Sequence, residues 1–161
     1  MDITKRHALR KSDLRKVKES LHAIIGDQVE KLFGKSIEYI ETDKLELYAE
    51  DKIVLAFKEG DVVLPSLRAL NNELVLLPTV TVDMGAVPYV TNGADIMAPG
   101  ITKITPGLEE GSFVTIIDER HGKSLAVGKL LKASDEIIAS KKGKVIKNLH
   151  YVNDDIWSLE L

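Results

Sequence analysis

Cysteine is absent from the 161 residues of this chain, which excludes disulfides, thiolate nucleophiles and cysteine zinc sites. Aromatic residues are also scarce, at 5% of the sequence, so few side chains are available to stack on nucleic-acid bases. No window of 18 uncharged apolar residues occurs, and residues 1–7 lack the apolar core of a signal peptide. We therefore expect a cytoplasmic protein with no membrane partner.

The overall charge is slightly acidic, with a formal net charge of −3 at pH 7. Two segments are nevertheless basic: residues 1–18 carry seven Lys or Arg against two Asp, and residues 120–147 carry eight against two acidic residues. Screening limits the reach of distant charges to about 8–10 Å, so local patches of this kind can bind phosphate on an acidic protein. For each single lysine the competing interpretation is a solvated surface position.

The first 75 residues predict a small α+β domain, with one or two helices on an antiparallel sheet. Apolar residues recur at helical spacing from Leu14 to Ile25, with Ser12 expected as the N-cap and Gly26 as the end of the helix. A second short helix is expected over residues 28–33. Further along, the pattern predicts a hairpin over 37–49, strands over 53–57 and 62–64, and a short helix that Ser66 opens.

The most informative stretch runs from Thr79 to Ile101 and predicts a strand, a short helix, a glycine turn and a second extended segment. Residues 79–82 favour a strand, residues 86–91 a helix of about two turns, and Gly93 a left-handed backbone at its end. The chain becomes extended again at Ile96 and is interrupted at Pro99. We expect such a turn to expose backbone N–H groups at Gly93 and Ala94, close to a phosphate–sugar backbone, because no side chain intervenes.

The remainder of the chain predicts short strands separated by turns, a pattern typical of a small barrel. Strands are expected over residues 113–117, 124–131, 145–152 and 156–159, with a short helix over 135–139. The first two of these strands form a hairpin with residues 120–123 at its tip. A basic loop is expected over residues 141–144.

Several of these segments resemble the PUA domain, an RNA-binding module named after pseudouridine synthases and archaeosine transglycosylases. They are Val82–Ala86 (VDMGA), Gly93–Ile101 (GADIMAPGI), Leu125–Lys129 (LAVGK) and Lys147–Trp157 (KNLHYVNDDIW). Their amino-acid sequences are similar to those of the T-cell-malignancy-associated translation factor family and its archaeal relatives. The resemblance is strong over about residues 78–158 and weaker before that. It implies an α+β domain over 1–75 and, over 76–161, a mostly-β PUA barrel, a pseudo-barrel with short helices.

The resemblance also implies which residues bind RNA. In the module, RNA lies along the helix and its loop, the following strand and the last strand. The matching positions here are Gly93, Ala94, Asp95, Met97, Pro99, Lys147, Asn148 and His150. Tyr89 offers an aromatic face on the helix, with core packing as its alternative role. Lys103, Arg120 and Lys123 are candidate phosphate contacts without support from a motif.

Signatures of catalysis are missing from the sequence. The four histidines are scattered without metal-pair spacing, and there is neither a nucleophile elbow nor a nucleotide-binding loop of the P-loop type. We expect Asp95 to bond to backbone N–H groups and fix its turn, and not to act as a nucleophile. We therefore expect no enzyme activity, no catalytic residue, no metal and no cofactor.

The resemblance implies non-catalytic RNA binding, on tRNA 3′ ends or the small ribosomal subunit, during translation initiation or recycling. The resemblance implies a second translation factor as a protein partner. Two alternatives stay open: a protein-interaction scaffold, which the acidic balance and scarce aromatics favour, and the RNA-binding subunit of an RNA-modification complex.

Overall fold

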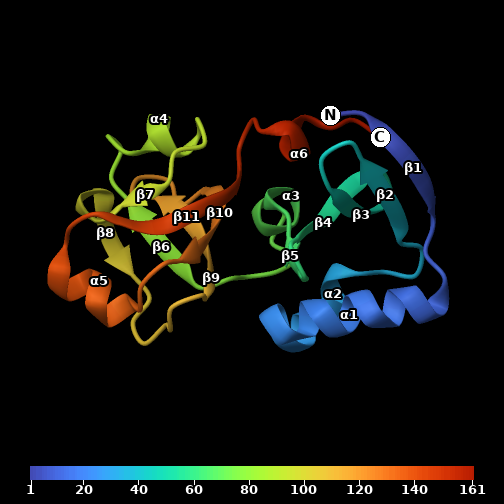
Figure 1. The fold of residues 1–161 in the computed structure, drawn as a ribbon, viewed down its shortest axis with the longest axis horizontal. Helices are drawn as coiled ribbons and strands as arrows, with labels where there is room; N and C mark the ends of the chain where they lie inside the picture. Colours follow the sequence, from blue (N-terminus) through green and yellow to red (C-terminus); the bar gives the residue numbers. More distant parts are fainter. The chain divides into compact units, whose positions relative to one another are not determined.

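The computed structural model describes every residue from Met1 to Leu161 (Figure 1). The chain divides into two compact units, one of Met1–Leu76 with Ser158–Leu161 and one of Leu77–Trp157. The sequence prediction placed the last four residues in the second domain. That the two units are independently folding domains stays a prediction. Each unit is described by itself.

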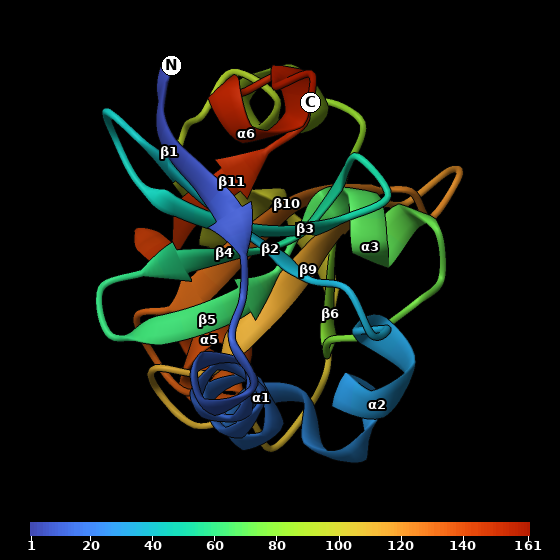
Figure 2. The ribbon, with the colours of Figure 1, turned by 90° about the vertical axis from the view of Figure 1, so that its right-hand side faces the viewer.

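The first unit is built on one antiparallel sheet. Its strands occur in the order in which they follow one another in the chain: β1 (Ile3–Ala8), β2 (Glu38–Thr42), β3 (Glu46–Glu50), β4 (Ile53–Glu59) and β5 (Val62–Pro65). Helix α1 (Lys11–Ile25) lies beside β5 (Figures 1 and 2). The remaining helices are η1 (Gly26–Gln28), α2 (Val29–Leu32) and α3 (Leu67–Asn71).

Apolar periodicity explains the core of this unit. Val17, Leu21 and Ile25 form the buried stripe of α1. They share one helical face because residues three or four apart are neighbours on a helix surface. Gly26 ends α1 with a φ of +62°, as the sequence predicts. Ser66 caps α3 by accepting the backbone N–H of Ala69, which confirms that expectation as well.

The sequence patterns miss one strand of this unit and misplace one helix cap. Residues 3–8 form β1, which pairs with β2 and is exposed at all six positions. Because no apolar alternation marks this strand, the pattern rules could not detect it. Helix α1 begins at Lys11 with Arg10 as its N-cap, so Ser12 lies inside the helix and caps nothing.

The second unit is built on one sheet whose strands run in the order β7-β11-β10-β9-β6-β8. Their bounds are β6 (Thr79–Val82), β7 (Ile96–Met97), β8 (Ile101–Ile104), β9 (Phe113–Asp118), β10 (Ser124–Leu130) and β11 (Lys144–Tyr151). All pairs are antiparallel except β6 with β9. The two edge strands, β7 and β8, are separated in sequence only by the three residues of η2 (Ala98–Gly100), so the sheet curves back towards itself.

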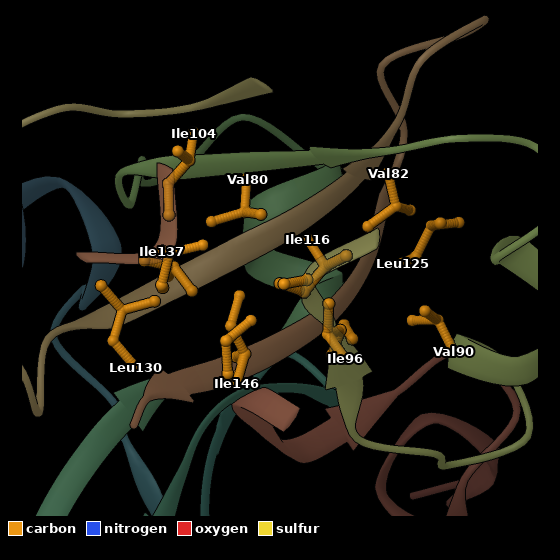
Figure 3. Packing of buried hydrophobic residues seen from close by; sticks show 14 residues of the cluster. Val80, Val82, Val90, Ile96, Ile104, Ile116, Leu125, Leu130, Ile137 and Ile146 are labelled. Carbon is orange, nitrogen blue, oxygen red and sulfur yellow. The ribbon is translucent and has the colours of Figure 1, made fainter. Parts of the chain in front are cut away.

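Helices α4 (Val87–Val90) and α5 (Ser134–Ser140) lie in connections between strands of this sheet, and α6 (Asp155–Ser158) follows the last strand. The core is made of aliphatic side chains from the strands together with Val90 of α4 and Ile137 of α5 (Figure 3). Val80, Val114, Ile116, Leu130 and Ile146 have no exposed surface. Val90 joins α4 to this core, next to the strand β11 where the site is found.

One prediction for the second unit is wrong and another is confirmed. The strand expected over 156–159 is helix α6 in its first three residues, because Asp154 Oδ1 accepts the backbone N–H of Trp157 and starts a helical turn (2.9 Å). The predicted interruption at Pro99 is confirmed: η2 separates β7 from β8, and these two strands lie on opposite edges of the sheet.

Candidate nucleic-acid interface

Helix α4 is positioned by the turn that follows β6. The carboxylate of Asp83 accepts the backbone N–H of Ala86 at 2.8 Å, and Pro88 lies in the first turn, where its missing N–H costs nothing. Val90 points into the core with 2% of its surface exposed, whereas Tyr89 is 70% exposed. The short helix therefore buries one side chain and presents an aromatic ring to solvent.

The turn after α4 is closed by its own backbone. Gly93 has a φ of +91°, as predicted, and its N–H donates to Val90 O at 3.1 Å. The N–H of Ala94 donates to Tyr89 O at 3.0 Å. Both donors therefore satisfy the last carbonyls of the helix. The expectation that they are free to face a phosphate is wrong.

The space beside Gly93 is filled by Tyr151. A Cβ placed on Gly93 would lie 2.9 Å from two carbons of this ring. The expectation that no side chain intervenes at this turn is therefore also wrong. Gly93 is required for the close approach of a β11 side chain of the protein, which fixes the loop against the sheet.

Asp95 joins the loop to β11. One carboxylate oxygen accepts the backbone N–H of Asn148 at 2.9 Å, and the other lies 3.2 Å from Lys144 Nζ. The backbone hydrogen bond and the charges of Lys144 and Lys147 lower the pKa of Asp95, although partial burial opposes them. The predicted bond to a backbone N–H is present, with its donor on β11.

Asn148 and His150 serve the structure of this region. The side-chain amide of Asn148 donates to Val90 O at 3.1 Å and to Ala94 O at 3.0 Å, so both of its N–H groups hold the end of α4. His150 is fully buried, with Nδ1 2.7 Å from Asp154 Oδ2. A ligand on the surface cannot reach the imidazole, so the prediction that His150 contacts RNA is wrong.

The exposed residues of this region form what we call the α4–β11 face: Tyr89, Ala94, Met97, Lys144 and Lys147. The pairing of β7 with β11 places Met97 opposite Lys144, and Met97 is 50% exposed. Sequence reasoning identified the basic segment over 141–147 but missed Lys144 as a site residue. Only the strand register shows that it lies beside Asp95 and Met97.

Arg120 and Lys123 lie at the tip of the β9–β10 hairpin, which is built around a buried carboxylate. Asp118, 4% exposed, accepts the backbone N–H groups of Arg120 (3.0 Å), His121 and Lys123 (3.2 Å). Burial raises the pKa of Asp118, but these hydrogen bonds outweigh it and the net pKa is lowered. The carboxylate of Glu119 accepts the N–H of Met84, so the tip lies beside the loop that leads into α4.

Pro99 and Lys103 lie apart from the α4–β11 face. Both line a separate groove between β8 and α5. The structure thus divides the predicted residues among a face on α4 and β11, a basic hairpin tip and this groove. No group of three or more His, Asp or Glu side chains is arranged to hold a metal ion. None of the helices combines the length and apolar composition of a membrane crossing.

Comparison with known proteins identifies the family. The PUA domain family matches residues 78–152. Translation machinery-associated protein 20 of Saccharomyces cerevisiae is 34% identical over 99% of this chain and 95% of its own length. The chain belongs to this family of PUA-domain proteins. An uncharacterized protein of Methanocaldococcus jannaschii is 40% identical over 99% of both chains.

Other members agree with this assignment. Malignant T-cell-amplified sequence 1-B of Xenopus laevis is 38% identical over 60% of this chain and 55% of its own. The crystal structure of a hypothetical protein from Pyrococcus horikoshii superposes with a TM-score of 0.83, at 31% identity, over 95% of this chain and 98% of the other. The family predicted from the sequence is confirmed.

Proposed function

We propose that this protein binds the single-stranded 3′ end of an RNA, such as a tRNA acceptor end, on the α4–β11 face of its second unit. Membership of a PUA family whose yeast member is named for the translation machinery supports a role in translation. The protein acts without catalysis, in the cytoplasm, on the small ribosomal subunit and together with a second translation factor.

The observation that carries the proposal is the exposure of Tyr89. In a chain with few aromatic residues, this ring is 70% exposed, and the residue after it is buried. Stacking of a base on an aromatic ring contributes about 1–3 kcal/mol and tolerates any base. An exposed ring on a well-anchored helix therefore suits an unpaired RNA end, whose bases are free to stack.

Charge on the same face supplies the second part of the recognition. Lys144 and Lys147 are exposed and flank Asp95. Asp95 holds the loop and partly balances the charge of these two lysines. The face is therefore suited to contact a few phosphates at short range and does not produce a strong, far-reaching positive field. Ala94, in the loop after α4, adds a small exposed side chain to the same face. Arg120 and Lys123 at the hairpin tip extend the path of the RNA backbone beyond the start of α4.

Fluorescence anisotropy with a labelled tRNA acceptor-end oligonucleotide tests the proposal. Removing a stacked ring by Tyr89→Ala should weaken binding by about 5- to 150-fold, the equivalent of one lost base stack. Lys144→Ala combined with Lys147→Ala should lower the salt slope of log K by about 1.4, because each phosphate contact on a single strand contributes about 0.7.

Lys35→Ala combined with Lys52→Ala is the matched control, because it removes two exposed charges from the first unit outside its basic segment. The control should leave the affinity within twofold. Absence of binding at about 50 mM salt, where phosphate contacts are strongest, would contradict RNA binding altogether. Failure of the tagged protein to sediment with small ribosomal subunits in a sucrose gradient would contradict the ribosomal role alone.

A further inference from the structure

Strand β8 has an open edge. It pairs with β6 on one side and is the last strand of the sheet order on the other. The N–H of Thr105 donates to Thr79 O at 3.1 Å, just beyond the end of β8. Because hydrogen bonding alternates along an antiparallel pair, the N–H and C=O groups of Ile104 point away from β6, whereas a register shift between Ile101 and Lys103 interrupts the alternation at Thr102. This edge offers backbone donors and acceptors to a further strand.

An apolar groove runs along this open edge. It has a volume of about 430 Å³ and lies between β8 and α5. Ile101 of β8 and Ile137 and Ile138 of α5 form its apolar surface, and Ile138 is 46% exposed. Figure 3 shows Ile104 and Ile137 close together at the inner side of this region. The volume lies within the ~300–1,000 Å³ of typical ligand sites.

Hydrogen bonds between the two walls close both ends of the groove. At one end the hydroxyl of Ser134, the first residue of α5, donates to Thr105 O at 2.7 Å. At the other end the N–H of Ala98 donates to Gly143 O at 2.8 Å, joining η2 to the loop after α5. A peptide chain therefore cannot run through the groove along β8. A chain that pairs with this edge has to end inside it.

The charge of the groove selects which chain end fits. Its charged side chains are Lys103 on β8 and Lys141 at the end of α5, and no acidic residue lines it. Two ammonium groups attract a carboxylate and repel an amino terminus. The lining contains no aromatic ring on which a nucleobase could stack. A peptide fits this groove better than RNA does, because of its isoleucine surface, the free strand edge and the two lysines.

We propose that this groove binds the free carboxyl terminus of a partner protein. The last residues of the partner add as a short strand to β8, an apolar side chain packs on Ile101 and Ile138, and the terminal carboxylate lies between Lys103 and Lys141. This is β-strand addition, in which backbone pairing gives affinity and side-chain contacts give specificity. The proposal does not rest on RNA binding by the α4–β11 face.

The test uses the full chain and a library of octapeptides with free carboxyl termini and varied last four residues. We expect selection of peptides with an apolar final residue. Amidation of the selected peptides should weaken binding at least tenfold, measured by fluorescence polarisation. Backbone amide signals of Thr102 and Ile104 should shift in nuclear magnetic resonance spectra on addition of the peptide.

Variants separate the contributions. Lys103→Met combined with Lys141→Met should weaken peptide binding at least tenfold, whereas Lys142→Met, which removes a neighbouring lysine outside the groove, should not. Circular dichroism checks that each variant is folded.

Any one of three results would overturn the proposal. The library could yield no peptide above the blank matrix, or the selected peptides could bind equally well after amidation. The variant with Lys103→Met and Lys141→Met could also bind the peptides as tightly as the wild type. Binding of a single-stranded RNA tetranucleotide that shifts the Thr102 and Ile104 amides would reassign the groove to nucleic acid. RNA binding on the α4–β11 face is measured separately with the acceptor-end oligonucleotide and Tyr89→Ala. Loss of peptide binding therefore does not imply loss of RNA binding, or the reverse.

Discussion

At the scale of single residues, the region around α4 is held by side chains that the sequence presents as candidate ligand contacts. Asn148 satisfies two carbonyls at the end of α4, and Tyr151 fills the space beside Gly93. Their partners lie more than 50 residues away in sequence, so pattern rules cannot detect them. Gly93 itself could be predicted, because its left-handed φ is a local requirement.

Replacing Gly93 by alanine tests this arrangement. The new Cβ would have to accept a φ of +91° and lie 2.9 Å from the Tyr151 ring, so we expect a loss of about 1–3 kcal/mol in the free energy of unfolding. Urea denaturation measures it. Gly122→Ala is the control, because it has a φ of +66° but open space around the Cβ and should cost less. Equal losses in both variants would contradict the role of Tyr151.

At the scale of elements, local signals were reliable where the chain determines its own conformation. The strand at 79–82, the short helix after it and the Ser66 cap are all present. Strand β1 could not be predicted, because it is exposed throughout and is held by pairing with β2. The segment at 156–158 was expected to be a strand but is helical, because Asp154 caps it.

The β9–β10 hairpin tip depends on Asp118, whose carboxylate accepts three backbone N–H groups. Its pKa is lowered from an ordinary value of 3.8. The ionised Asp118 therefore contributes fully to the free energy of unfolding above about pH 4. This contribution is lost as the pH falls through the lower pKa of Asp118 in the folded state. Asp118→Asn replaces one acceptor with a donor and should cost about 1–3 kcal/mol at neutral pH.

Urea denaturation of the wild-type chain and Asp118→Asn at several pH values measures this difference. The difference in the free energy of unfolding between the two chains should become smaller below pH 4. At position 118 only the wild-type side chain can be protonated, so only the wild type loses this contribution there. A gap that is constant down to acidic pH would show that the charge of Asp118 does not stabilise the tip.

At the scale of the whole molecule, the family could be identified from the sequence, whereas the separation of the candidate residues could not. Gly93, Pro99 and Lys103 are close in sequence, but η2 carries the chain from one sheet edge to the other between them. The predicted site is consequently divided between the α4–β11 face and the β8–α5 groove.

The most direct test of the central claim is a nuclear magnetic resonance titration of the full, ¹⁵N-labelled chain with a tRNA acceptor-end oligonucleotide. The account predicts that the largest amide shifts occur at Tyr89, Ala94, Met97, Lys144 and Lys147, and that Thr102 and Ile104 move little. Shifts centred on the β8–α5 groove or on the first unit, or no shifts at low salt, would contradict it.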